Sequence, residues 1–170
     1  DLVDNEGSEY LFAGGDNVKN TRGGCFTIGT DIFYGKLKFH IADVSGTDDC
    51  AFGFRTVEAF AANIDDYNNM AALNVISGDI KIETIDDNAA TTTTDTTDNW
   101  ADAAAHTLEV YVDLAGAVTY RIDGAPVTVT AAFTWDSGDV VAPFFFFLHA
   151  TDLAGAVPFM DLEVGFQTAR

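Results

Sequence analysis

The sequence predicts an all-β protein, built as a two-sheet antiparallel β-sandwich or jelly roll. Apolar and polar residues alternate strictly in many short segments, which is typical of half-buried strands. Turn-forming residues separate about a dozen such segments, as in sandwiches and jelly rolls. Helical periodicity is almost absent. We therefore expect one domain over residues 1–170, with an irregular N-terminal segment, residues 1–24, that contains an edge strand at residues 10–12.

The central stretch specifies its own register. After the alternating residues 106–113, the segment 114–116 is interpreted as a three-residue hairpin loop, because Gly116 provides the left-handed conformation that such a loop requires. The pairs that follow are Val112–Val118, Val110–Tyr120, Leu108–Ile122 and, on the other face, Glu109–Arg121. Asp123-Gly124 predicts a second hairpin, which places Tyr120 opposite Val127 and Val118 opposite Val129.

Other strands follow from the same alternation. We expect them at residues 25–30, 34–44, 50–55, 140–148 and 159–166. The Thr-rich residues 91–97 are expected to form an exposed edge strand or loop, and residues 58–62 one or two helical turns. The chain has two cysteines, Cys25 and Cys50, which is too few for a disulfide framework or a cysteine zinc site. They form either one disulfide bridge or two buried thiols.

The charge of the chain excludes several partners. It has 27 acidic and 8 basic residues, a net charge of -19. Nucleic acids and anionic membranes bind basic surfaces, so we expect neither as a partner. No apolar run reaches the roughly 18 residues of a membrane span, and no signal peptide is visible. The acidic surface favours solvation, cations or a basic partner.

The strand Phe144-Phe145-Phe146-Phe147 is aromatic on both faces, so both faces must be covered. One face is expected in the core. The other is covered by loops, by an oligomer partner or by a ligand. We predict that, if the protein has a partner surface, these four residues form it.

Three segments carry a family resemblance: residues 106–110, residues 118–124 and residues 143–145. They resemble the central hairpins of the concanavalin A-like lectin/glucanase superfamily, especially its laminin-G-like members, and the likeness extends over roughly residues 25–166. The resemblance implies a concanavalin A-like sandwich. The acidic, Thr-rich and Lys-poor composition is also similar to accessory structural proteins of tailed phages.

Catalysis is not expected. Glycoside hydrolases of this superfamily place a nucleophile and an acid on one face of an inner strand, as Glu-x-Asp-x-x-Glu, and no such segment occurs here. Glu109 is expected to pair with Arg121 instead, and no third carboxylate follows Asp161-Leu162-Glu163. His106 and His149 are interpreted as structural residues at strand ends. We predict a non-enzymatic protein.

Calcium is the one metal that the composition favours, although we expect no obligatory cofactor. Hard oxygen ligands are plentiful in the loops, and Asp65, Asp66 and Asn68 are the first candidates. A solvated acidic loop is the competing interpretation.

Two functions remain. The first is a virion structural or accessory protein, a capsid decoration or fibre component, held in a homo-oligomer or against other virion proteins. The alternative is a carbohydrate-binding, lectin-like module in which Tyr67, Trp100 and Trp135 are exposed and stack on sugar rings. Either function implies a virion or extracellular location.

Overall fold

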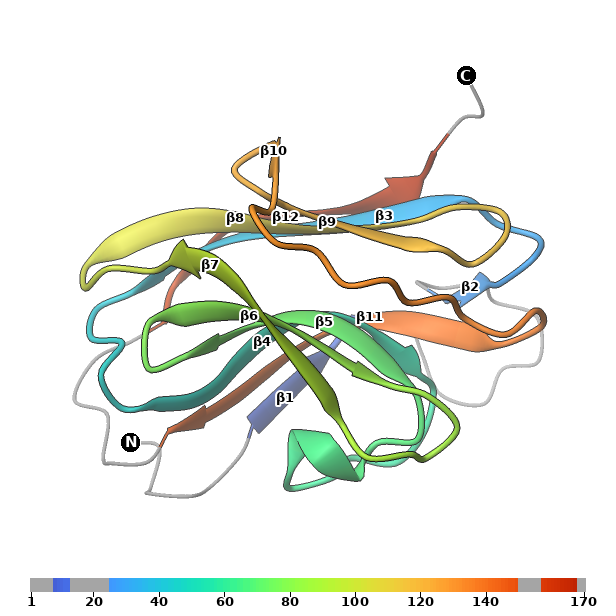
Figure 1. Ribbon diagram of the computed structural model, residues 1–170, viewed down its shortest axis with the longest axis horizontal. Coiled ribbons are helices and arrows are strands. Elements are labelled where there is room, and N and C mark those ends of the chain that lie inside the picture. Colours follow the sequence, from blue (N-terminus) through green and yellow to red (C-terminus); the bar gives the residue numbers. More distant parts are fainter. Residues whose placement is uncertain (1–7, 13–24, 150–156, 168–170) are drawn as a thin grey trace.

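The computed structural model describes residues 8–12, 25–149 and 157–167, which form two antiparallel sheets packed face to face (Figure 1). The seven-stranded sheet has the order β1 (Ser8–Leu11), β11 (Val140–His149), β4 (Thr47–Thr56), β5 (Met70–Ile76), β6 (Asp79–Ile85) and β7 (Thr92–Asn99), and β2 (Phe26–Thr27) also pairs with β11. The five-stranded sheet has the order β10 (Ala125–Pro126), β9 (Val118–Ile122), β8 (Ala104–Val112), β3 (Phe33–Ile41) and β12 (Phe159–Phe166). The predicted all-β sandwich is confirmed. In the described part of the chain, no helix has the length and apolar character needed to cross a membrane.

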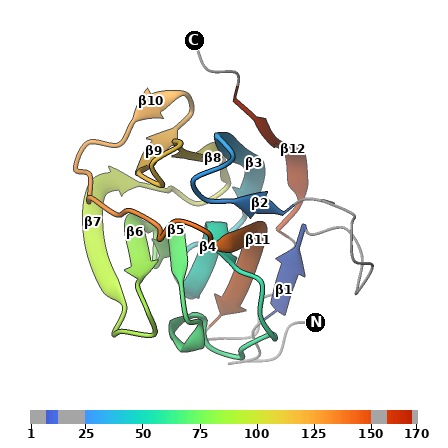
Figure 2. The same ribbon diagram turned by 90° about the vertical axis from the view of Figure 1, so that its right-hand side faces the viewer.

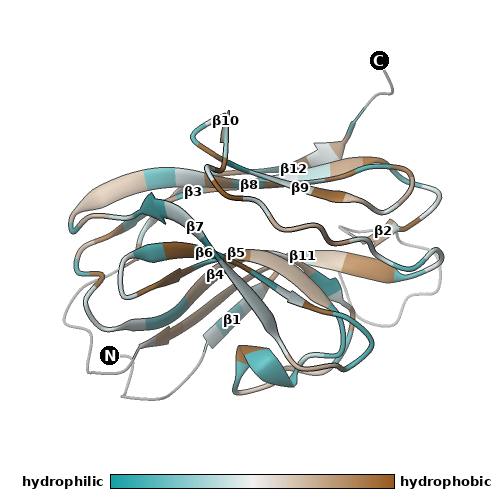
Figure 3. Cartoon of the chain, viewed as in Figure 1, coloured by the Kyte–Doolittle hydropathy of each residue, from teal (hydrophilic) through white to brown (hydrophobic). Residues whose placement is uncertain are grey.

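The core lies between the sheets and follows the predicted alternation. Leu37, Phe39 and Ile41 of β3 are buried there, as are Phe52 and Phe54 of β4. Removing one such side chain from water stabilises the fold by roughly 2 kcal/mol. Figure 3 contrasts the apolar β11 with β7, which is polar and forms an edge of its sheet. The predicted edge strands at residues 10–12 and 91–97 therefore correspond to β1 and β7.

The register of the β8–β9 hairpin is the predicted one in every pair. Gly116 has a φ of +87°, and the second turn has φ values of +52° at Asp123 and +83° at Gly124. Turn chemistry and the apolar pattern thus specify the same pairing.

The strand after this turn is much shorter than expected. The backbone N–H of Val127 still donates to Tyr120, but the predicted pairing of Val118 with Val129 is wrong. Val118 N donates to Phe133 O at 3.0 Å, and Val129 N donates to Thr96 O on β7 at 3.0 Å. Pro126 is paired with Arg121 at the edge of the five-stranded sheet, where proline is tolerated. After Val127 the chain leaves this sheet and bonds to the exposed edge of the other sheet (Figure 2).

Two local predictions are also corrected. Of residues 25–30, only Phe26–Thr27 is a strand. The helical turn expected at residues 58–62 lies later, as the 3₁₀ helix η1 (Ile64–Asp66). Asn63 determines this start, because its side chain accepts a hydrogen bond from Asp65 N at 3.1 Å.

All four rings of Phe144–Phe147 are buried by the chain itself, which corrects the expected partner surface. Phe145 and Phe147 lie in the core between the sheets. Phe144 and Phe146 point outward and are covered by residues 57–69, with the ring of Tyr67 6.1 Å from that of Phe144. Of the covers considered from the sequence, the loop is the one that is present.

Candidate functional site

The outer face of the seven-stranded sheet has an apolar part and a polar part. The apolar part, over β11, is the one covered by residues 57–69. The polar part contains Asp49 of β4, Asn74 of β5 and Glu83 of β6. These three strands are neighbours in the sheet. Successive side chains of a strand point to opposite faces. Each of the three residues points outward, because a residue next to it in the chain lies in the core between the sheets: Cys50, Leu73 or Ile82.

A single amide joins the two carboxylates. Asn74 Nδ2 donates to Asp49 Oδ1 at 2.6 Å and to Glu83 Oε2 at 2.7 Å. Asn74 Oδ1 accepts from Cys50 N at 2.8 Å, which fixes the orientation of the amide. The exposed fractions are 9% for Asp49, 5% for Glu83 and 0% for Asn74. We call these three residues the carboxylate–amide cluster.

Burial perturbs both acids of the cluster. Burial raises the pKa of Asp49 to about 6; the hydrogen bond from Asn74 opposes this rise, and the charge of Glu83 adds to it. Burial also raises the pKa of Glu83. Within the described residues, neither carboxylate forms an ion pair that would offset the cost of burial. Perturbed acids of this kind concentrate at functional sites.

Groups at the rim of the cluster are accessible to solvent. The hydroxyl of Thr93 donates to Glu83 Oε1 at 3.3 Å, and that of Thr91 donates to Asp65 Oδ1 at 2.6 Å. The ammonium of Lys81 lies 4.0 Å from Asp79 and is partly exposed. The face therefore offers carboxylates, hydroxyls and one ammonium, which are groups that hydrogen-bond to the hydroxyls of a polar ligand.

The sequence contains one signal for this cluster. Asn74 is the one polar residue in the strand Met70–Ile76, whose sequence is MAALNVI. A lone amide in an apolar strand must find partners when it is buried. Glu83 is 9 residues from Asn74 and Asp49 is 25, on the next and the preceding strand, so the register of these strands identifies the partners.

The calcium candidates do not converge in the structure. Asp65 accepts from Thr91, whereas the side-chain amide of Asn68 donates to Glu58. Asp66 is exposed. Over residues 8–12, 25–149 and 157–167, no group of three or more His, Cys, Asp or Glu side chains is arranged to hold a metal ion. The contact of Asn68 with Glu58 lies within the covering loop, and that of Asp65 joins the loop to Thr91.

The three aromatic candidates are buried and lie apart, which corrects the expectation that they are exposed. Tyr67 is 1% exposed, Trp100 2% and Trp135 3%. Tyr67 packs under the guanidinium of Arg55 at 4.3 Å, and Trp100 packs against Phe39 with ring centres 4.6 Å apart. Their ring faces contact the protein, so they are not available to a sugar.

The predicted pair of Glu109 and Arg121 is adjacent in register, but the side chains have other partners. Glu109 accepts from the hydroxyl of Tyr111 and lies 4.0 Å from the ammonium of Lys36. Arg121 donates to Gly124 O at 3.1 Å. His106 Nδ1 lies 2.6 Å from Asp123 Oδ2, in keeping with a structural histidine. The side chain of His149 is not described.

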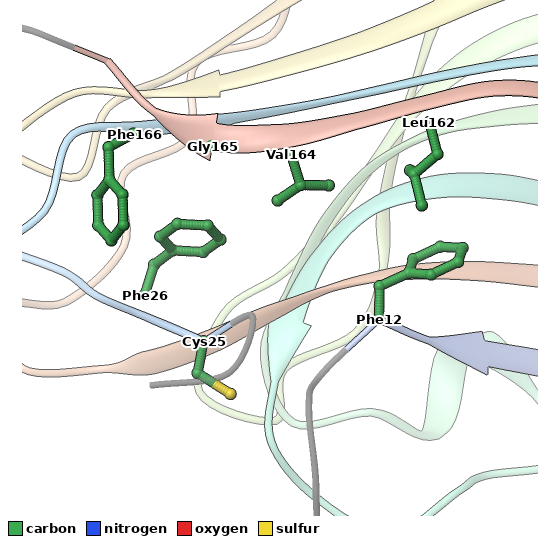
Figure 4. Close-up of a pocket in the computed structure, with 7 residues that line it drawn as sticks. All are labelled: Phe12, Cys25, Phe26, Leu162, Val164, Gly165 and Phe166. Atoms are coloured by element: carbon green, nitrogen blue, oxygen red, sulfur yellow. The ribbon is translucent and has the colours of Figure 1, made fainter. Parts of the chain in front are cut away.

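An apolar pocket of about 360 Å³ lies at the edge of the sandwich where β12 faces β1 and β2 (Figure 4). Its lining is Phe12, Cys25, Phe26, Leu162, Val164, Gly165 and Phe166. No charged side chain is among these residues, so this pocket is a weaker candidate for a polar ligand than the carboxylate–amide cluster.

Both Cys25 and Cys50 are free thiols, which excludes the predicted alternative of a disulfide bridge between them.

Comparison with known proteins identifies the fold. No family model and no curated protein sequence matches the chain. Among solved structures, Xenopus laevis galectin-Ib superimposes with a TM-score of 0.54 at 7% identity and covers 93% of this chain and 100% of its own. The carbohydrate-binding module CBM66 of Bacillus subtilis reaches 0.51 at 13% identity and covers 79% of this chain and 74% of its own. An alginate lyase of Pseudomonas aeruginosa superimposes with a TM-score of 0.50 at 12% identity and covers 84% of this chain and 68% of its own.

These likenesses show the fold alone, a concanavalin A-like jelly-roll sandwich, as the sequence predicted. The same fold includes binding proteins and a lyase, so the fold does not decide between binding and catalysis. None of the three structures is described as a virion protein. The virion role, the homo-oligomer and the virion or extracellular location stay predictions.

Proposed function

We propose that this protein is a carbohydrate-binding, lectin-like module, and that it binds glycan hydroxyls at the carboxylate–amide cluster. The observation that carries the proposal is the pair of buried carboxylates, Asp49 and Glu83, held by Asn74. The two acids accept the hydrogen bonds of the buried Asn74 amide, but burying two carboxylates side by side still costs stability. A ligand that donates hydroxyl hydrogen bonds to the cluster would offset that cost.

The fold supports the same assignment. Galectins and a carbohydrate-binding module share this sandwich. With a net charge of -19 the protein repels polyanions, so we infer a neutral, hydroxyl-rich ligand at this face.

The test is a glycan array followed by affinity electrophoresis in gels that contain the bound polysaccharide. The variant Glu83→Gln keeps an acceptor for Asn74 and removes the charge; we expect it to weaken binding at this face by about tenfold, the effect of losing a charged hydrogen bond. Asp136→Asn is the matched control, since it removes one charge from an exposed loop residue. Retention of full affinity by both Glu83→Gln and Asp49→Asn would contradict the proposed site.

Catalysis is measured in the same samples. We expect the polysaccharide to keep its length over prolonged incubation. Shortening of the chain by the unmodified protein, abolished by Glu83→Gln, would show that the cluster is an active site and would overturn the binding-only assignment.

A further inference from the structure

We propose a second glycan-binding surface, on the outer face of the five-stranded sheet, that takes a neutral linear glycan laid across the strands. This face lies on the opposite side of the sandwich from the carboxylate–amide cluster (Figure 1). The proposal adds a separate site, and it extends the function proposed above.

A row of alternating charge crosses four neighbouring strands of this face. Glu163 of β12 is opposite Lys36 of β3, Lys36 is opposite Glu109 of β8, and Glu109 is opposite Arg121 of β9. The ammonium of Lys36 lies 3.9 Å from Glu163 and 4.0 Å from Glu109. Two of the eight basic residues of the chain stand in this one row, and its charges sum to zero. Glu109 is buried and holds Lys36 and Tyr111 in place, whereas Lys36, Arg121 and Glu163 reach solvent. The row thus offers donors and an acceptor without a net charge, which fits hydroxyl groups better than carboxylates or sulfates.

An aromatic row runs beside the charged one. Tyr34 of β3 is opposite Tyr111 of β8, and their rings stack with centres 5.7 Å apart and planes 22° apart. The hydroxyls are anchored, Tyr34 to Glu163 and Tyr111 to Glu109. Both rings are half-buried. The ring faces contact each other and two cations: the ammonium of Lys36 lies 5.3 Å from the ring centre of Tyr34, and the guanidinium of Arg121 lies 5.6 Å from that of Tyr111. The exposed ring edges, held beside these donors, therefore form the amphipathic surface against which a sugar would pack.

The residues that flank the aromatic row are small. Gly165 of β12 is opposite Tyr34, and Thr119 of β9 is opposite Tyr111. A Cβ added at Gly165 would lie 3.5 Å from the hydroxyl oxygen of Tyr34, an ordinary contact, so Gly165 can be replaced without disturbing the backbone around it. A larger side chain there would cover the ring of Tyr34. Strands are spaced about 4.8 Å apart, so a row of four strands spans about 14 Å, roughly the length of three sugar rings.

The length and charge of the ligand are tested by isothermal titration calorimetry. Neutral gluco- and galacto-oligosaccharides from the mono- to the hexasaccharide are compared with alginate fragments of matched length. We expect affinity for the neutral series to rise up to about the trisaccharide and then level off, as the row of strands is filled. Tighter binding of the alginate fragments, or affinity that does not depend on length, would overturn the inference.

Variants separate this surface from the first one. Tyr111→Ala removes an aromatic ring, and Gly165→Val covers the other one while retaining a residue that suits a strand. We expect each to weaken binding at this face by about tenfold, which is about 1.4 kcal/mol. Asp136→Asn is again the control, and thermal unfolding of each variant identifies any loss of folding.

The outcomes of the two proposals are distinct. If Glu83→Gln abolishes all binding and Gly165→Val has no effect, the second surface fails and the proposed function stands. If Gly165→Val and Tyr111→Ala abolish all binding and Glu83→Gln has no effect, the second surface stands and the carboxylate–amide cluster is not a site. If the folded protein binds none of the glycans, both proposals fail.

Discussion

Arg55 of β4 and Glu9 of β1 form a buried, two-pronged ion pair across the outer face of the seven-stranded sheet. Arg55 Nε lies 2.6 Å from Glu9 Oε1, and Arg55 Nη2 lies 2.8 Å from Oε2. The side chain of Arg55 is 1% exposed and that of Glu9 6%. The guanidinium also stacks on Tyr67 and donates to Thr56 O at 2.8 Å. One residue thereby ties the edge strand, a central strand and the covering loop together.

Arg55→Met should destabilise the protein by about 3–5 kcal/mol, because it leaves the Glu9 carboxylate buried without a partner. Urea denaturation measures this loss. The double variant Arg55→Met/Glu9→Leu removes both charges and should recover most of the stability. A double variant no more stable than Arg55→Met would show that the hydrogen bonds to the loop, and not the charge pair, make the larger contribution.

Asp49 should make the stability of the protein depend on pH. Its pKa is raised in the folded state from 3.8 to about 6, so the folded protein binds this proton more tightly than the unfolded chain does. The stabilisation from that proton is complete below pH 4 and is lost as the pH rises through about 6. Glu83, whose pKa is also raised, acts in the same direction.

Asp49→Asn should therefore stabilise the protein by about 3 kcal/mol at pH 7 and by much less at pH 4. Chemical denaturation at a series of pH values measures the difference, with Asp136→Asn as the control. The same substitution weakens glycan binding if the proposed function is right, since functional groups often cost stability. A variant less stable than the parent at pH 7 would contradict the charged state assigned to this buried acid.

Gly53 should tolerate no side chain. A Cβ at this position would lie 2.2 Å from Ala71 O and 2.8 Å from the Cβ of Ala72, both on the neighbouring strand β5. Gly53→Ala thus forces β4 and β5 apart in the middle of the sheet and should cost several kcal/mol or prevent folding. Gly165→Ala is the matched control, because its Cβ has ordinary contacts at 3.5 Å or more. Thermal unfolding compares the two, and equal melting temperatures would refute the predicted clash.

The two free thiols should differ in reactivity. Cys50 is completely buried, and burial raises the pKa of its thiol well above the usual value. Cys25 is half-buried, and the pKa of its thiol is raised less strongly. Titration of the native protein with a thiol reagent should show one reacting group, and the second should react only in denaturant. Cys25→Ser should remove the native reaction, and a fast reaction that survives it would contradict the burial of Cys50.

The sequence by itself determined the sandwich, the β8–β9 register and both turns. Those features depend on alternation and on residues such as Gly116 and Gly124, whose conformational preferences act locally. Only the tertiary structure decided which polar side chains meet. Asn74 joins Asp49 and Glu83 because β4, β5 and β6 are neighbours, and Tyr67 is buried because the covering loop folds over Phe144. Side-chain contacts between strands depend on register, sheet order and loop path, and the lone amide in the strand Met70–Ile76 signals a need for partners without identifying them.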